Sequence, residues 1–209
     1  RMQATLDEIR RNLEGIRGVT GNNFINNGLS GFIQYYNSSL YLALVETAYA
    51  YSEDEITQHA RTGEFKTDKI YPWEMASAPQ GFYKKTENRI ATTKWLIWRL
   101  NKEPREITLD EFSNNGLSGL MNHYNASPYL ALVEAGYAHS LDEIKEHART
   151  GEFKTDKVYP WEMTRAPFIY DDKKLRIAAT KWLVWRLNKD PREITKDDFS
   201  NNGLSGLMN

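Results

Sequence analysis

Histidine is the side chain best suited to acid–base or metal chemistry near neutral pH. This sequence has four histidines: His59, His123, His139 and His147. Only His59 and His147 occupy matching positions, in two copies of the motif HARTGEFKTDK. Neither stands at the spacing of a paired-histidine metal site, and the chain contains no cysteine to act as a ligand or nucleophile. We therefore expect neither a metal nor a cofactor.

The repeated GLSG sequence resembles the nucleophile elbow of a hydrolase at first sight. That motif needs a glycine two residues after the serine, and Phe32 or Leu120 stands there instead. Recurring carboxylates such as Glu46 and Glu134 fall on expected helix faces or caps. The sequence also lacks a phosphate loop and a dinucleotide fingerprint. These patterns predict that the protein is not an enzyme.

The tryptophans invite a binding interpretation but favour a structural one. One group lies three residues apart within apolar segments, where large aromatic side chains usually belong to the core. These residues are Trp95, Trp98, Trp182 and Trp185. Trp73 and Trp161 lie in the proline-containing motif YPWEM, and we expect each to fix a linker to the core.

The elements that carry these residues recur along the chain. The hexapeptide NNGLSG occurs at residues 26–31, 114–119 and 201–206. Longer matches pair residues 41–75 with 129–163, and 89–113 with 176–200. About two thirds of the aligned positions are identical, and the period is about 87 residues. Such a period suits a small multi-helix module better than a single helical hairpin.

The phase of the repeat predicts three units. Residues 1–75 form a degenerate first unit, 76–163 a complete second unit, and 164–209 a truncated third unit or cap. The sequence therefore suggests either a piece of a longer array or an array closed by its last half-unit.

Capping residues and apolar periods predict an all-α fold of about five helices per unit. We expect helices at 117–125, 127–137, 140–151 and 173–187, and a short helix after Thr195. The predicted caps are Ser127 before Pro128, Ser140 with Glu143 and Gly151, and Asp171 or Asp172. A turn is expected at PWEM, and left-handed caps at Gly28, Gly116 and Gly203.

The two short helices around NNGLSG have the order of a helix-turn-helix, whose second helix reads bases in the major groove. Its exposed positions are Ser30, Gln34 and Tyr35 in the first unit and Ser118, Asn122 and His123 in the second. Phosphate contacts are predicted for Arg99, Lys102, Arg105, Arg186, Lys189 and Arg192. The pattern thus predicts binding to double-stranded DNA.

A family resemblance points the same way. The chain resembles the helical repeats found beside homing endonucleases and in related phage and bacterial proteins. The matching residues are Pro104, Asp110, Phe112, Ser127, Ala131, Leu132, Ala135 and Gly136. This resemblance covers about half of each unit and implies DNA binding.

Composition keeps an alternative open. The formal net charge of −1 is unlike that of a typical nucleic-acid-binding domain, so the chain could instead be a helical scaffold for protein–protein interaction. The open C-terminal half-unit predicts pairing with another protein or a second copy. No apolar run approaches a membrane span and the N-terminus has no signal-peptide core, so we expect a cytoplasmic protein.

Overall fold

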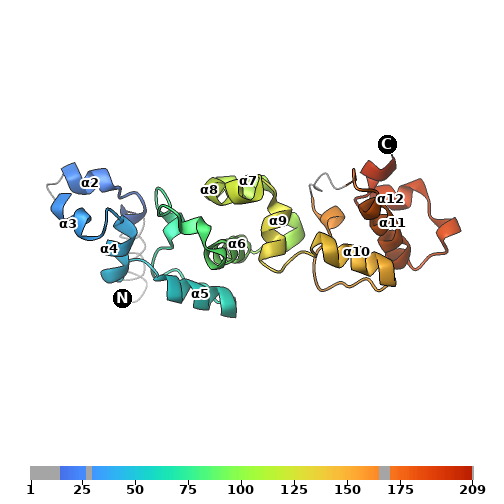
Figure 1. Cartoon of the computed structure of the whole chain (residues 1–209), viewed down its shortest axis with the longest axis horizontal. Coiled ribbons are helices and arrows are strands. Elements are labelled where there is room, and N and C mark those ends of the chain that lie inside the picture. Colours follow the sequence, from blue (N-terminus) through green and yellow to red (C-terminus); the bar gives the residue numbers. More distant parts are fainter. Residues whose placement is uncertain (1–14, 27–29, 165–169, 209) are drawn as a thin grey trace, which may run out of the picture.

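The computed structural model describes residues 15–26, 30–164 and 170–208 of the chain. Within these residues the structure is helical, and β pairing is limited to isolated bridges at Ala50–Ile70 and Ala138–Val158. The all-α prediction is therefore confirmed. Figure 1 shows an elongated molecule in which the helices follow one another along the longest axis.

The helices are short apart from two of 15 residues, α6 and α11. The first half contains α2 (Gly21–Asn26), α3 (Ser30–Tyr35), α4 (Leu40–Glu46), α5 (Glu53–Thr62), η1 (Pro72–Glu74), η2 (Phe82–Lys84) and α6 (Thr86–Leu100). The middle contains η3 (Pro104–Glu106), α7 (Leu109–Asn114), α8 (Ser118–Met121), η4 (Asn122–Tyr124), α9 (Pro128–Glu134) and α10 (Leu141–Thr150). The last part contains η5 (Pro160–Glu162), α11 (Lys173–Leu187), η6 (Pro191–Glu193), α12 (Lys196–Asn201) and η7 (Ser205–Met208). None of these described helices is both long and apolar enough to cross a membrane.

Local hydrogen bonds begin and end the helices where the sequence predicts. The Ser140 hydroxyl accepts from the Glu143 amide at 3.2 Å, and the Glu143 carboxylate accepts from the Ser140 amide at 2.7 Å. Gly151 then ends α10 in the left-handed conformation, with φ of 80°. Asp172 caps α11 by accepting from the Lys174 amide at 2.7 Å. These reciprocal bonds satisfy amide groups that would otherwise be unpaired at a helix start.

The glycines of the NNGLSG corner behave as predicted where the structure describes them. Gly116 and Gly203 both have φ of 76°, a conformation that glycine adopts without the steric cost of a Cβ. Gly28 lies outside the described residues. The backbone therefore turns sharply between α7 and α8, and again between α12 and η7.

Two large hydrophobic cores hold the helices together. The first joins α5 and η1 to α6, α7 and α8, with Trp73, Trp95 and Phe112 at its centre. The second joins α10 and η5 to α11, with Trp161 and Trp182 in matching places. The sequence repeat predicts a boundary between the first and second units at residues 75 and 76. The first core contains residues from both sides of that boundary.

Two smaller clusters accompany these cores. In one of them, Leu40 and Leu44 of α4 pack with Ala50 and Ile70. In the other, Tyr129 and Leu132 of α9 pack with Ala138, Val158 and Met163. Helices α4 and α9 therefore connect neighbouring groups of helices.

The tryptophans differ in burial more than their spacing predicts. Trp95 and Trp182 are buried, as are Trp73 and Trp161, so the structural interpretation holds for these four. Trp98 and Trp185 are 38% and 37% exposed. Each indole packs on one buried phenylalanine, Trp98 on Phe65 and Trp185 on Phe153, and the rest of the indole is partly open to solvent.

Candidate interaction surfaces

The predicted base-reading positions are exposed in both corners. Gln34 and Tyr35 lie on α3, Ser118 on α8, and Asn122 and His123 on η4, all open to solvent. The side chain of Ser30 lies outside the described residues. The second helix of the corner is short, because α8 ends at Met121 and continues only as one 3-10 turn.

A tyrosine packs against one side of this corner. A Cβ placed on Gly119 would lie 3.5 Å from the Tyr83 ring, and one on Gly206 would lie 2.9 Å from the Tyr170 ring. The imidazole of His123 also lies 6.3 Å from the Tyr83 ring centroid. The second glycine of NNGLSG therefore allows the tyrosine before each long helix to approach the corner closely.

Four of the six predicted phosphate-binding side chains lie beside carboxylates. The ion pairs are Lys102–Glu111 at 2.7 Å, Lys189–Asp198 at 2.7 Å, Arg192–Asp190 at 2.9 Å and Arg99–Glu74 at 3.6 Å. Burial alone would raise the pKa of Glu111, but hydrogen bonds from Lys102 and Thr108 outweigh it and hold that pKa at about 2. Hydrogen bonds from Lys189 and Thr195 lower the pKa of Asp198 to about 2. Much of the predicted basic surface is thus neutralised within the chain.

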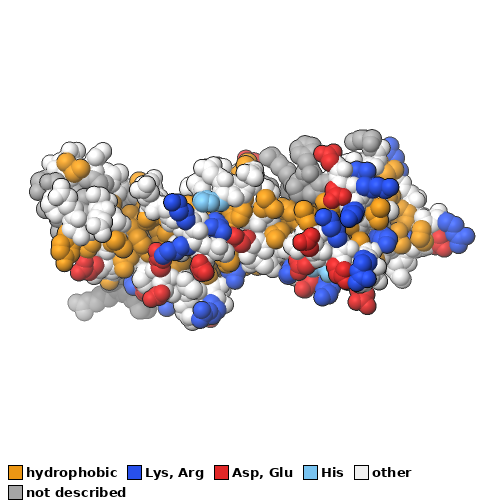
Figure 2. Space-filling model, in the orientation of Figure 1, with side chains coloured by type: hydrophobic (Ala, Val, Ile, Leu, Met, Phe, Trp, Pro, Cys, Tyr) orange, Lys and Arg blue, Asp and Glu red, His pale blue; other side chains and the backbone are white. Residues whose placement is uncertain are grey.

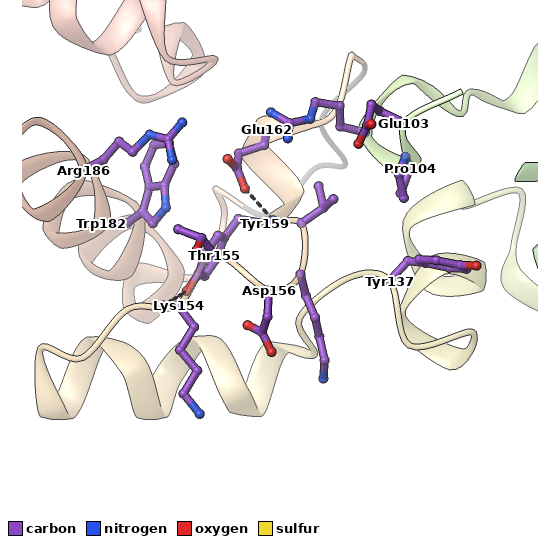
Figure 3. Close-up of a pocket in the computed structure, with 13 residues that line it drawn as sticks. Glu103, Pro104, Tyr137, Lys154, Thr155, Asp156, Tyr159, Glu162, Trp182 and Arg186 are labelled. Atoms are coloured by element: carbon purple, nitrogen blue, oxygen red, sulfur yellow. Dashed lines mark hydrogen bonds between the residues drawn. The ribbon is translucent and has the colours of Figure 1, made fainter. Parts of the chain in front are cut away.

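The other two basic residues, Arg105 and Arg186, line a pocket of about 200 Å³ between neighbouring groups of helices. Figure 3 shows that η3 supplies one wall, the loop from Lys154 to Tyr159 supplies another, and α11 supplies Trp182 and Arg186. Glu162 and Arg186 point toward one another across this space (Figure 3). We call this space the junction pocket.

The junction pocket mixes both signs of charge. Four basic residues and three acidic residues share its lining: Arg105, Lys154, Lys157 and Arg186 with Glu103, Asp156 and Glu162. Figure 2 likewise shows basic and acidic side chains interspersed on the visible face, with hydrophobic side chains along the long axis. A site for a polyanion normally concentrates one sign of charge, so this balance favours a partner that is itself mixed in charge.

The preceding pair of helix groups meets at Arg17 and Glu74 through the same kind of backbone contact, but there ion pairs to Glu74 lie at the junction. Arg17 Nη2 lies 3.0 Å from Glu74 Oε1, and Arg99 Nη1 lies 3.6 Å from the same oxygen. The carbonyl of Arg17 accepts from the Ala76 amide at 3.1 Å, as that of Arg105 accepts from the Thr164 amide at 3.0 Å. A chain segment from each group of helices therefore meets the next group through the same backbone contact.

The two partly exposed tryptophans occupy matching positions, Trp98 on α6 and Trp185 on α11. Trp98 packs on Phe65 with ring centroids 5.7 Å apart, and Trp185 packs on Phe153 at the same distance. Each tryptophan is followed by an arginine, Arg99 or Arg186, in the sequence. We call these the Trp–Arg surfaces. The sequence interpretation assigned these tryptophans to the core because spacing within a helix does not show which neighbours cover each side chain.

In the described part of the chain, no three histidine or acidic residues gather as ligands for a metal ion. Comparison with protein-family models, curated proteins and solved structures found no match for this chain. The resemblance to homing-endonuclease-associated repeats therefore stays a prediction.

Proposed function

We propose that the chain is a non-catalytic scaffold of tandem helical units that binds a protein partner through the Trp–Arg surfaces. The observation that carries this proposal is the equal exposure of Trp98 and Trp185, 38% and 37%, at matching positions of the repeat. Tryptophan and arginine are the side chains most enriched among the residues that dominate protein–protein binding energy.

The setting of each tryptophan supports this role. The buried rings of Phe65 and Phe153 hold the indoles in place, so little side-chain entropy would be lost on binding. The Arg99 guanidinium lies over the ring of the buried Trp95, 5.2 Å from its centroid, and Arg186 lines the junction pocket with Trp182. A partner that reaches an exposed indole and the neighbouring arginine would therefore combine apolar and acidic side chains. Repetition along an elongated chain would let one partner engage both surfaces at once.

Double-stranded DNA is the second candidate. The exposure of Ser118, Asn122 and His123 on the α7–α8 corner favours it, because such side chains can contact base edges. The ion pairs of Lys102 and Lys189 weigh against it, because phosphate binding would have to displace carboxylates 2.7 Å away. The scaffold is therefore the better-supported proposal.

The test is a selection of peptides from a random library on the full chain. We expect selected peptides to bind at least tenfold more weakly to the double variant Trp98→Ala and Trp185→Ala. Met208→Ser, which alters another exposed hydrophobic side chain, serves as the matched control and should leave affinity unchanged. Circular dichroism would verify that all variants remain helical.

Two outcomes would contradict the scaffold. Peptides that bind the tryptophan variants as tightly as the wild type would remove the Trp–Arg surfaces from the proposal. A gel-shift titration on mixed-sequence duplex provides the second arm. Binding that falls steeply as salt rises, and that is lost in Asn122→Ala, would favour DNA instead.

A further inference from the structure

The loop before each YPWEM turn carries an aspartate that faces an aromatic core. In the first core, Tyr51 Oη donates to Asp68 Oδ1 at 2.6 Å, and this bond ties the loop at residues 66–71 to the core. His139 stands at the matching position of the second core. Its Nε2 lies 3.7 Å from Oδ1 of Asp156, the aspartate that matches Asp68. The same two positions are therefore bonded in one copy and separated in the other.

The His139 ring is enclosed but makes no hydrogen bond. The residue is 1% exposed, and neither ring nitrogen has a partner among the described residues. A neutral imidazole carries a proton on only one nitrogen, whereas an imidazolium donates from both. Protonation of His139 therefore ensures a donor at Nε2, on the side that faces Asp156.

The titratable groups around the His139 ring come from α9, α10 and the loop, and they are Tyr129, Glu143, His147, Asp156, Lys157 and Tyr159. His147 Nδ1 and the two tyrosine hydroxyls already have hydrogen-bond partners. Lys157 and Glu143 pair with each other at 2.7 Å, so their opposite effects on a charge at His139 partly cancel. Asp156 is therefore the group that gains a contact when His139 takes up a proton.

We propose that His139 and Asp156 form a proton-operated latch, in which a proton from solvent on His139 draws the Asp156 carboxylate into a charge-assisted hydrogen bond. The two atoms need to approach only from 3.7 Å to about 2.8 Å. The Asp156 side chain is 62% exposed, so it can move without leaving a buried contact. The closed latch ties the loop to the second core as the Tyr51–Asp68 bond ties the matching loop to the first core without a proton from solvent.

The latch connects the second core with the junction pocket. The loop from Lys154 to Tyr159 forms one wall of that pocket, and Asp156 is one of its three acidic residues (Figure 3). In the closed latch the charge of Asp156 is balanced by His139, which leaves the four basic residues of the pocket with Glu103 and Glu162. Acidification therefore makes the pocket more electropositive and holds one of its walls in place. This inference does not depend on the Trp–Arg surfaces.

The pH at which the latch closes follows from the surroundings of His139. Burial lowers the pKa of His139, the nearby His147 adds to this effect, and the Asp156 carboxylate opposes it. The latch is therefore open at pH 7.5 and closes below about pH 6.5.

The experiment follows the imidazole signals of the full chain by NMR from pH 8 to pH 4.5, with the His139 signals assigned by their absence in His139→Tyr. We expect the midpoint of the His139 titration to fall by about 1 pH unit in Asp156→Asn, because that variant removes the carboxylate that favours the imidazolium. Glu152→Gln is the matched control. It removes an exposed carboxylate beside the same loop and should leave the midpoint unchanged.

Backbone order parameters of the same samples provide a second measurement. Those of residues 154–157 should rise as His139 takes up its proton and should approach those of residues 66–69, the matching loop. Asp156→Asn should abolish this rise. Asp68→Asn should loosen residues 66–69 at pH 7.5 as well as at pH 5, because the bond to Tyr51 needs no added proton.

Two results would overturn the proposal. The first is a His139 midpoint that is the same in the wild type and in Asp156→Asn, or that falls equally in Glu152→Gln. The second is a loop whose order parameters do not change while His139 titrates. Asp156→Asn alters an exposed side chain, and circular dichroism would verify that the variant remains helical, so a folding defect is distinguishable from the absence of a latch.

Discussion

Replacing His139 with tyrosine should stabilise the second aromatic core. The matching residue in the first core is Tyr51, and the two rings lie in the same place. The centroid of His139 is 4.8 Å from that of His147 at an interplanar angle of 86°, and Tyr51 stands at the same distance and angle from His59. The second core therefore already accommodates an aromatic ring at position 139 in the orientation that tyrosine adopts.

The two rings differ in their polar contacts. Tyr51 Oη donates to Asp68 Oδ1 at 2.6 Å. His139 Nε2 lies 3.7 Å from Asp156 Oδ1, beyond hydrogen-bond range, and neither ring nitrogen has a partner among the described residues. The His139 side chain is nevertheless almost fully buried, with the residue 1% exposed.

These contacts set the expected magnitude. A hydrogen bond to a charged group contributes about 1.5–3 kcal/mol, and removing a buried unpaired polar group recovers about 1–3 kcal/mol. The Asp156 side chain is 62% exposed, so solvent reduces the first contribution, and the larger tyrosine ring can cost about 1–3 kcal/mol in packing. We expect His139→Tyr to raise the free energy of unfolding of this region by about 1–2 kcal/mol.

Native-state hydrogen exchange measures this change locally. Amides of α10 and α11 should exchange more slowly in His139→Tyr, while those of α5 and α6 serve as an internal reference. His139→Phe is the control, since it removes the unpaired nitrogens without supplying a hydroxyl for Asp156. The reasoning is refuted if His139→Tyr protects α10 and α11 no better than His139→Phe does.

Three further predictions follow from the same contacts. Burial lowers the pKa of His139 below its usual 6.5, so the unfolded chain binds more protons than the folded chain below about pH 6.5. The free energy of unfolding therefore falls as the pH drops below that value. Denaturant titrations should show a shallower fall between pH 6.5 and 5 in His139→Tyr. Gly203→Ala should lower the free energy of unfolding by more than about 2 kcal/mol, because the new methyl group would overlap the Trp161 carbonyl oxygen and strain the left-handed backbone. The control is Gly136→Ala, where the backbone is also left-handed but no atom lies near the new methyl group. It should cost about 1 kcal/mol in the same unfolding assay. Trp182→Ala should cost about 3–5 kcal/mol by calorimetry and Trp185→Ala markedly less, since only the first is buried.

Helix ends were the features most readily predicted from the sequence. The capping box of Ser140 and Glu143, the terminator Gly151 and the cap at Asp172 all lie where the pattern places them. These are short-range hydrogen bonds and backbone preferences, so a few neighbouring residues decide them. The all-α class followed from the same signals.

The candidate surfaces depend on contacts that local patterns do not reveal. Trp95 and Trp98 are both apolar positions of one helix, and only the packing of α5 and its following loop buries the first and half-exposes the second. Lys102 was predicted to meet phosphate, but the turn after α6 brings Glu111 within 2.7 Å of it. Tertiary neighbours, rather than residue type, thus determine which charges remain available for a partner.

Packing provides a reason for the repeated hexapeptide that needs no ligand. Its first described glycines turn the chain with φ of 76° beside the carbonyls of Trp73 and Trp161. Its second glycines, Gly119 and Gly206, leave room for a tyrosine ring. Backbone geometry and packing already require these glycines. The fact that the hexapeptide is identical in its copies therefore does not favour a base-reading role. Differences between otherwise matching sites are more informative: Tyr51 donates to Asp68 in the first core, whereas the ring nitrogens of the matching His139 have no partner among the described residues.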